Sequence, residues 1–203
     1  IIMYQNPYLN LKMRVAVFDN KDSFTFNLVH RIESHVQAVQ VIRNDDPKAL
    51  SKLSNFDAWI ISPGPGLPDK SGCLMEVLEN GFGKIPILGV CLGFQALTLH
   101  NGGKLIHLKR PQHGKEHLIL KSNPNSNLFK NIHFPFQVGL YHSWAIDPET
   151  IKASNLTYSE SGVLMSGEWE NEMAFGIQFH PESIMTPQGD SILKNWITVI
   201  KKN

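Results

Sequence analysis

Four short apolar runs in the first half of the chain constrain its fold most strongly. Each run is nearly continuous rather than alternating, which is typical of strands covered on both faces of a parallel sheet. Segments with helical character follow the runs. The runs are residues 14–18, 38–42, 58–61 and 85–90. Because connections between parallel strands are right-handed crossovers, this order indicates an α/β layer fold.

The first helical segment begins after the first apolar run. Asp22 or Ser23 can cap its N-terminus, since both side chains accept hydrogen bonds from free backbone N–H groups. Phe26, Val29 and Ile32 repeat at a spacing of three residues, so we expect these three side chains to face the core.

Beyond residue 103 the pattern changes to short alternating runs separated by turns. Such runs are typical of hairpins and of edge strands. They are residues 104–108, 118–120, 153–158, 163–166 and 174–179, and a last helix is expected over 191–200. We therefore predict a three-layer α/β fold with a central, mostly parallel sheet, helices on both of its faces, and extra antiparallel edge strands in the C-terminal half.

The chain length fits one domain. At about 150 residues per domain, 203 residues suggest one large domain rather than two small ones. No linker, low-complexity stretch or internal repeat divides the sequence. We expect a single domain over 1–203, with residues 1–12 as an N-terminal extension.

Charge and cysteine content restrict the partners. Lys and Arg number 19 and Asp and Glu 18, which gives a net charge of +1. A dedicated binder of nucleic acid or of an anionic membrane would carry a concentrated positive charge, so neither partner is expected. The most apolar stretch, 85–94, is interrupted by Pro86, Gly89 and Gly93 and is too short to span a bilayer. Two cysteines and the lack of a secretion signal in residues 1–12 indicate a cytoplasmic setting.

Cys91 lies in the sequence Gly-Val-Cys-Leu-Gly, where a buried strand is expected to turn into a helix over 92–99. A residue at such a turn is held above the C-terminal edge of the sheet, and the two glycines allow close approach of the chain segments. The N-terminus of the following helix favours a thiolate. Cys91 is therefore a candidate nucleophile, although a buried structural cysteine explains this turn equally well.

His180 and Glu182 favour the catalytic interpretation. They belong to a His-Pro-Glu sequence directly after the expected strand 174–179, which Pro181 ends. A cysteine nucleophile needs a base, and an imidazole serves best when a carboxylate fixes its tautomer and supports its charged form. Cys91, His180 and Glu182 thus form a candidate triad.

The loop 62–66, Ser-Pro-Gly-Pro-Gly, follows the expected strand 58–61 and should lie at the same sheet edge as Cys91. It lacks the ending of a phosphate-binding P-loop and the third glycine of a dinucleotide-binding loop. One interpretation is a rigid turn. In the functional interpretation, the backbone N–H groups of Gly64 and Leu92 stabilise the oxyanion that forms when a thiolate attacks a carbonyl.

The nine histidines do not predict a metal site. His113 and His117 are four residues apart, and in an extended segment their Cα atoms would be about 13 Å apart, too far for one ion. No Cys-x-x-Cys pair completes a ligand set, and Cys73 lies in a helical pattern that places it in the core. We expect no metal in this chain.

Together these motifs resemble those of the class I, or triad, glutamine amidotransferases, whose GxCxG and HPE elements match residues 89–93 and 180–182. Within that class the chain resembles the glutaminase subunits of anthranilate synthase and of aminodeoxychorismate synthase. The resemblance extends over about residues 14–200. The segments that carry it are residues 19–27, 43–45, 62–66, 113–115, 141–143 and 180–184.

The resemblance implies a role for each matching residue. Cys91 would attack the side-chain amide of glutamine to form a glutamyl thioester, His180 would act as base and then as acid, and Glu182 would orient His180. Gly64 and Leu92 would supply the N–H groups of the oxyanion hole. The other matching positions shape the pocket or bind the substrate: Pro65, Gly66, Gln95, Ser143 and Trp144.

Three positions depart from the family pattern. Phe94 stands where many relatives have His, Leu140 where Arg is common, and Trp144 where Leu is common. All three lie outside the candidate triad. We expect them to affect local packing, the substrate pocket or a partner contact, and not the chemistry.

The resemblance also implies a partner. Ammonia reacts as uncharged NH₃, which water near neutral pH would protonate, so a shielded route to the acceptor is expected. We expect a separate, chorismate-using synthase to dock at the sheet edge that carries Cys91, with contacts from His113, Gly114, Lys115 and the loop 62–70. Mg²⁺ is expected only on that synthase, and no cofactor in this chain.

Three functions remain open at this point. The first is a glutaminase subunit that serves anthranilate synthesis, aminodeoxychorismate synthesis or both. The second is a stand-alone cysteine hydrolase, against which the glutamine-binding set of Gln95, Ser143 and Trp144 argues. The third is an inactive regulatory or scaffolding relative, against which the complete candidate triad argues.

Overall fold

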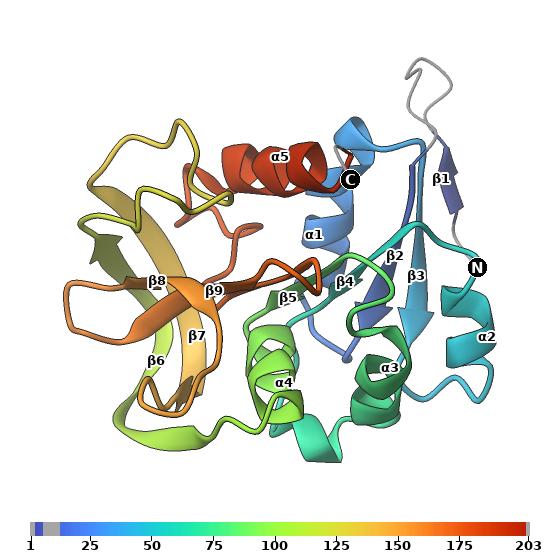
Figure 1. The fold of residues 1–203 in the computed structure, drawn as a ribbon, viewed down its shortest axis with the longest axis horizontal. Helices are drawn as coiled ribbons and strands as arrows, with labels where there is room; N and C mark the ends of the chain where they lie inside the picture. The colour runs from blue at the N-terminus through green and yellow to red at the C-terminus, as the bar shows by residue number, and fades with distance from the viewer. Residues whose placement is uncertain (1–2, 6–12, 202–203) are drawn as a thin grey trace.

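A computed structural model describes residues 3–5 and 13–201 and contains an eight-stranded mixed sheet (Figure 1). Its strand order is β1-β3-β2-β4-β5-β10-β9-β8. The strands are β1 (Met3–Gln5), β2 (Arg14–Asp19), β3 (Ala38–Arg43), β4 (Ala58–Ile61), β5 (Ile87–Val90), β8 (Ser154–Tyr158), β9 (Leu164–Trp169) and β10 (Ala174–Ile177). Strands β3, β2, β4, β5 and β10 run parallel. At one edge β1 pairs antiparallel with β3, and at the other edge β9 pairs antiparallel with β10 and β8 antiparallel with β9.

Helices cover both faces of this sheet, as predicted. On one face α1 and α5 pack against each other, and α2, α3 and α4 lie on the other face (Figure 1). The helices are α1 (Thr25–Ile32), α2 (Ala49–Leu53), α3 (Leu74–Gly81), α4 (Leu92–His100) and α5 (Gly189–Ile200), and two 3₁₀ turns span Glu33–His35 and Pro68–Lys70. The three-layer α/β prediction is therefore confirmed.

The alternation of side chains along β2 divides the interior into two cores. Val15 and Val17 belong to the core beneath α1 and α5, whereas Ala16 and Phe18 belong to the core beneath α2, α3 and α4. Both sets are fully buried because successive side chains of a strand point to opposite faces. This double burial explains why the strand appears in the sequence as a continuous apolar run.

The buried face of α1 differs from the predicted one. Its buried residues are Thr25, Leu28, Val29 and Ile32, while Phe26 is 46% exposed. The helix begins at Thr25 rather than at Asp22 or Ser23, and the buried positions then follow the i, i+3, i+4, i+7 pattern from that residue. A spacing of three residues alone therefore predicted burial of Phe26 incorrectly and did not find Thr25 and Leu28.

Strands β6 (Leu105–Ile119) and β7 (Phe136–Ile146) form a separate two-stranded antiparallel sheet. The prediction of two short strands, 104–108 and 118–120, was wrong, and β7 was not predicted. Register shifts near His107 and His113 interrupt the pairing, and most of β6 is exposed. Bulges and exposure remove the regular apolar alternation by which a strand is found in a sequence.

The expected N-terminal extension 1–12 lies mostly outside the described residues. Its described part, β1, pairs antiparallel with β3, with Met3 opposite Gln40. Within residues 3–5 and 13–201, no helix has the length and apolar character needed to cross a membrane.

Candidate active site

Cys91 occupies a strained turn between β5 and α4. Its backbone dihedrals are φ +53° and ψ −102°, a conformation that is costly for a residue with a Cβ atom. Its N–H donates to the carbonyl of Ile177 on β10 at 2.8 Å, which ties the turn to the neighbouring strand. The strain is held by the surrounding sheet, as expected for a nucleophile elbow.

The glycines on either side of Cys91 are required by close packing. A Cβ atom on Gly89 would lie 2.5 Å from the backbone of Gly93, and one on Gly93 would lie 2.4 Å from the carbonyl oxygen of Ile61. Strand β5, helix α4 and strand β4 thus meet without room for side chains. This contact places the N-terminus of α4 beside Cys91, as the predicted strand-to-helix turn requires.

His180 and Glu182 form a buried pair. His180 Nδ1 lies 2.6 Å from Glu182 Oε1, and both side chains are almost fully withdrawn from solvent. The rings of Tyr141 and Phe24 pack against the imidazole at centroid distances of 4.8 and 6.1 Å. The carboxylate fixes the proton on Nδ1, and the aromatic rings hold the imidazole in place.

His180 also interacts with Cys91. Burial by itself lowers the pKa of His180, but its interactions with the Cys91 sulfur and the Glu182 carboxylate outweigh burial and raise this pKa well above its usual value. Nε2 of His180 is buried and makes no hydrogen bond of normal geometry within the described chain. The nitrogen not bonded to Glu182 is therefore free to exchange a proton with the sulfur. The structure brings all three candidate triad residues together.

Gly64 lies next to Leu92, the other residue predicted for the oxyanion hole. A Cβ atom on Gly64 would lie 2.9 Å from Leu92 Cδ2 and 2.6 Å from Asn20 Cβ. Asn20 holds the loop through two 2.9 Å hydrogen bonds, from its backbone N–H to the Ser62 hydroxyl and from its side chain to the Ser62 carbonyl. The loop that carries Gly64 is thus fixed against the start of α4.

A cavity of about 340 Å³ opens at Cys91. It brings together the predicted substrate residues, with the exception of Leu92. Its lining comprises Gly64, Pro65, Gly66, Cys91, Gln95, His107, His113, Tyr141, His142, Ser143 and Trp144. The loop 62–66, α4 and the β6–β7 sheet all contribute residues, so the cavity is formed by segments that are distant in the sequence.

The model of the class-I glutamine amidotransferase family matches residues 16–200 of the sequence. The chain belongs to this family. It is 39% identical over 188 residues to anthranilate synthase component 2 of Pyropia yezoensis, which covers 90% of this chain and 98% of that protein.

Two longer relatives contain the same region as a part. The chain is 36% identical to the bifunctional protein TrpGD of Thermotoga maritima and to an aminodeoxychorismate synthase of Streptomyces griseus, and the two alignments cover 92% and 91% of this chain. It spans 32% of the first protein and 26% of the second. Among solved structures, a protein from Thermoplasma acidophilum described as part of a putative GMP synthase shares the fold, with a TM-score of 0.81, 22% identity and 96% coverage of both chains.

Two of the departures from the amidotransferase pattern are accommodated by packing. Phe94 is fully buried and lies over Gly176, where a Cβ atom would be only 1.8 Å from its ring, and it packs edge-on against Trp169 at 6.1 Å. Leu140 is 1% exposed and belongs to the core beneath α1 and α5. Trp144 is different, because it lines the cavity and packs edge-on against His107 at 4.9 Å.

The residues predicted for the partner contact divide between two environments. His113 lines the cavity, and its Nε2 lies 2.9 Å from the Ser143 hydroxyl. Gly114 has a φ of +63° and open space around it, and Lys115 is exposed. His113 therefore lines the cavity at Cys91, where only a partner contact was predicted for it.

Three cavity residues were missed by the sequence analysis: His107, Tyr141 and His142. His142 is the most unusual of them, since burial lowers its pKa to about 4 while Nδ1 stays within 2.8 Å of the Trp144 carbonyl. The segment 141–143 carries part of the family resemblance, but the resemblance implies a role only for its last residue, Ser143. A prediction of β7 would have shown which of its side chains share a face.

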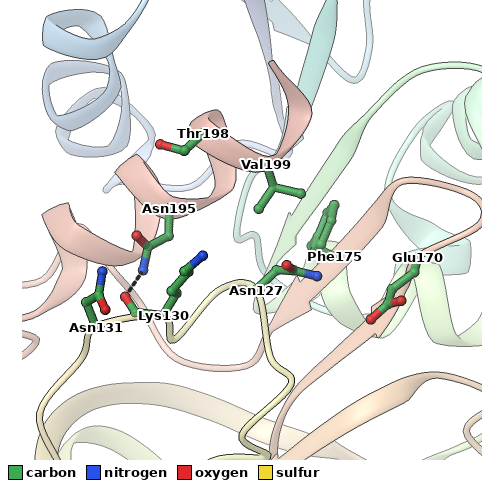
Figure 2. Close-up of a pocket in the computed structure, with 8 residues that line it drawn as sticks. All are labelled: Asn127, Lys130, Asn131, Glu170, Phe175, Asn195, Thr198 and Val199. Atoms are coloured by element: carbon green, nitrogen blue, oxygen red, sulfur yellow. Dashed lines mark hydrogen bonds between the residues drawn. The ribbon is translucent and has the colours of Figure 1, made fainter. Parts of the chain in front are cut away.

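A second hollow of about 500 Å³ shares no lining residue with the cavity at Cys91. Figure 2 shows it between α5 and the ends of β9 and β10, lined by Asn127, Lys130, Asn131, Glu170, Phe175, Asn195, Thr198 and Val199. Its dashed bond joins the side-chain amide of Asn195 to the carbonyl oxygen of Lys130 at 2.8 Å. Cys91 and His180 are not part of it, so it does not compete as the site of the chemistry. No group of three or more His, Cys, Asp or Glu side chains is arranged to hold a metal ion in the described residues.

Proposed function

We propose that this chain is the glutaminase subunit of an anthranilate synthase. The single observation that carries the proposal is a buried His180 that is bonded to Glu182 at 2.6 Å and interacts with Cys91, which lines a cavity of about 340 Å³. This arrangement provides a nucleophile, a base and an orienting carboxylate in one place. The cavity is large enough for an amino acid with an amide side chain.

The first half of the reaction forms a thioester. The thiolate of Cys91 attacks the Cδ carbonyl carbon of glutamine, and the N–H groups of Gly64 and Leu92 stabilise the oxyanion of the tetrahedral intermediate. His180 then gives its proton to the leaving nitrogen from Nε2, so that the C–N bond breaks and NH₃ departs. Glu182 keeps the imidazolium in position during this step.

The second half regenerates the enzyme. His180, now neutral, takes a proton from a water molecule, and the resulting hydroxide attacks the thioester carbon. Collapse of the second intermediate breaks the C–S bond and releases glutamate. The sulfur returns to its starting state, and the same imidazole has served as acid and as base.

The substrate ends are held by the β7 segment and α4. Gln95 donates from Nε2 to the Trp144 carbonyl at 2.9 Å, which fixes the backbone of Ser143 and Trp144 beside the cavity. In the proposal, this backbone holds the α-amino and α-carboxylate groups of glutamine. A general peptidase has no need of such an enclosure, which favours the amidotransferase over a stand-alone hydrolase.

The acceptor is proposed to be chorismate on a separate synthase subunit. The relative from Pyropia yezoensis, which this chain covers almost completely, is named a component of anthranilate synthase. The relative from Streptomyces griseus supports aminodeoxychorismate synthase as the alternative. In both cases the synthase docks at the sheet edge of Cys91, with contacts from residues 113–115 and the loop 62–70, and receives NH₃ without exposure to bulk water.

Reconstitution decides between these partners. The chain is combined with each candidate synthase, chorismate and glutamine labelled with ¹⁵N at the side-chain amide, and the products are analysed by mass spectrometry. We expect labelled anthranilate. Labelled aminodeoxychorismate from the second partner alone would reverse the pathway assignment, and unlabelled product or none from either partner would refute the glutaminase role.

A further inference from the structure

Gln178 is a buried polar residue next to the candidate triad to which the sequence analysis gave no role. It directly follows β10 and is 0% exposed. Its backbone N–H donates to the carbonyl of Met165 at 2.8 Å, so the backbone is fixed independently of the side chain. The side-chain amide is left to bond within the site.

The orientation of this amide follows from its neighbours. The Trp144 carbonyl can only accept, and it lies 2.9 Å from the Gln95 atom assigned as Nε2, which must therefore be the donating nitrogen. That nitrogen lies 3.2 Å from the Gln178 side chain, which must present its oxygen, Oε1, to it. The remaining group of Gln178, Nε2, then faces Cys91 Sγ at 3.5 Å.

We infer that Gln178 is a positioning residue that donates a hydrogen bond to the Cys91 sulfur and stabilises its thiolate. The nitrogen lone pair of an amide is delocalised into its carbonyl, so the NH₂ group donates and does not accept, and the thiol proton is directed away from Gln178 and toward His180 Nε2. After that proton moves to the imidazole, the donor of Gln178 faces a negative sulfur, and hydrogen bonds to charged acceptors are the stronger ones. The bond therefore favours the reactive state.

Gln95 and Gln178 connect the substrate cavity to the sulfur of Cys91. Gln95 lines the cavity, and its amide sets the orientation of the Gln178 amide, which in turn faces the sulfur. If Gln95 loses its donor, nothing fixes the Gln178 amide, and its oxygen can turn toward Cys91. The reactivity of the sulfur thus depends on a residue that does not touch it.

This inference rests on the proposed function, in which the thiolate of Cys91 attacks glutamine, but its test needs no glutamine. The rate of alkylation of Cys91 by iodoacetamide is measured against pH in the full chain, with mass spectrometry separating Cys91 from Cys73. The midpoint of the pH profile reports the formation of the thiolate. The variants are Gln178→Met, which keeps the volume without donors, Gln178→Glu, which replaces the donor by an oxygen, and Gln95→Met.

We expect the midpoint to rise by about one pH unit in Gln178→Met, a tenfold loss of thiolate at a fixed pH below the midpoint, and by more in Gln178→Glu. Gln95→Met should shift it in the same direction by a smaller amount. Ser166→Ala is the matched control, because Ser166 is equally buried, pairs with Ile177 next to Gln178 and has a hydroxyl without a hydrogen bond. Its profile should not change.

The thermal unfolding midpoint of each variant shows whether it folds. If Gln178→Met does not fold, the comparison is made with Gln178→Glu and Gln95→Met. Unchanged alkylation profiles in folded Gln178 variants would overturn the inference and leave the glutaminase proposal standing. Shifted profiles in a chain whose wild type does not hydrolyse glutamine would refute the proposed function and leave the role of Gln178 intact.

Discussion

His180 Nδ1 and Glu182 Oε1 lie 2.6 Å apart within a tripeptide, and both groups are buried. The intervening residue, Pro181, lies beyond the end of β10, and His180 also interacts with Cys91. A local sequence motif thus supplies the base and its orienting carboxylate, whereas the nucleophile comes from a distant elbow.

Glu182→Gln should keep the shape of the pair and remove its charge. The pKa of His180 would fall, because one of the interactions that raise it is lost while burial remains. We expect glutamine hydrolysis to slow by about 10²- to 10⁴-fold. Synthesis supported by ammonium salt in the synthase complex should stay near the wild-type rate. Equal loss of both activities would show that Glu182 acts on the fold and not on His180.

Gly64→Ala should impair the oxyanion hole. The new methyl group would lie 2.7 Å from the Asn20 carbonyl oxygen and 2.9 Å from Leu92 Cδ2, so the loop must move away from the start of α4. Loss of one oxyanion donor predicts a fall of about 10²-fold in kcat for glutamine. Gly162→Ala is the control, because Gly162 has a φ of +79° but no neighbours within 4 Å, and it should cost stability without lowering kcat. Wild-type kcat in Gly64→Ala would contradict the assigned position of the oxyanion.

His142 should make the fold less stable in mild acid. Its pKa is lowered by burial to about 4 in the fold, against an ordinary value of 6.5, so the unfolded chain binds the proton more readily. This contribution is fully present above pH 6.5 and is lost as the pH falls from 6.5 toward 4, by about 3 kcal/mol in total. Denaturant unfolding of the wild type and of His142→Asn over this range should give a shallower pH dependence in the variant. Parallel curves would show that His142 is not held neutral.

Lys115→Glu should weaken docking of the synthase. Lys115 is exposed and follows Gly114, the residue with positive φ at the register shift of β6. Reversal of a charge in an interface mainly slows association, and we expect the Kd of the complex to rise about tenfold. Lys109→Glu, at another exposed position of the same strand, should change it less than about twofold. Similar Kd values for both variants would remove Lys115 from the interface.

The sequence was sufficient to predict those parts of the protein in which the local pattern of apolar residues agrees with their burial. Strand β2 is buried on both faces and so appears as an uninterrupted apolar run, and Cys91 lies between two glycines that the packing requires. Strand β6 was predicted as two short pieces because it is exposed and bulged and shows no regular alternation. Strand β7 was overlooked, although Phe136, Val138 and Leu140 do alternate with more polar residues in its first half. Two of the cavity residues, Tyr141 and His142, were missed with β7.

Gln178 could not be found for a different reason. Nothing in its local sequence distinguishes a buried glutamine from an exposed one at a strand end. Its importance comes from Gln95 and Cys91, which lie 83 and 87 residues away in the chain. Side-chain orientation of this kind follows only from tertiary contacts.

Cys91→Ser tests the central claim most directly. In the reconstituted synthase complex, we expect glutamine-dependent product formation to fall by at least about 10³-fold, because a serine hydroxyl at this elbow is a much weaker nucleophile than a thiolate. Product formation with added ammonium salt should remain within about twofold of the wild type. Retained glutamine-dependent synthesis, or loss of both activities in a folded complex, would contradict a covalent role for Cys91.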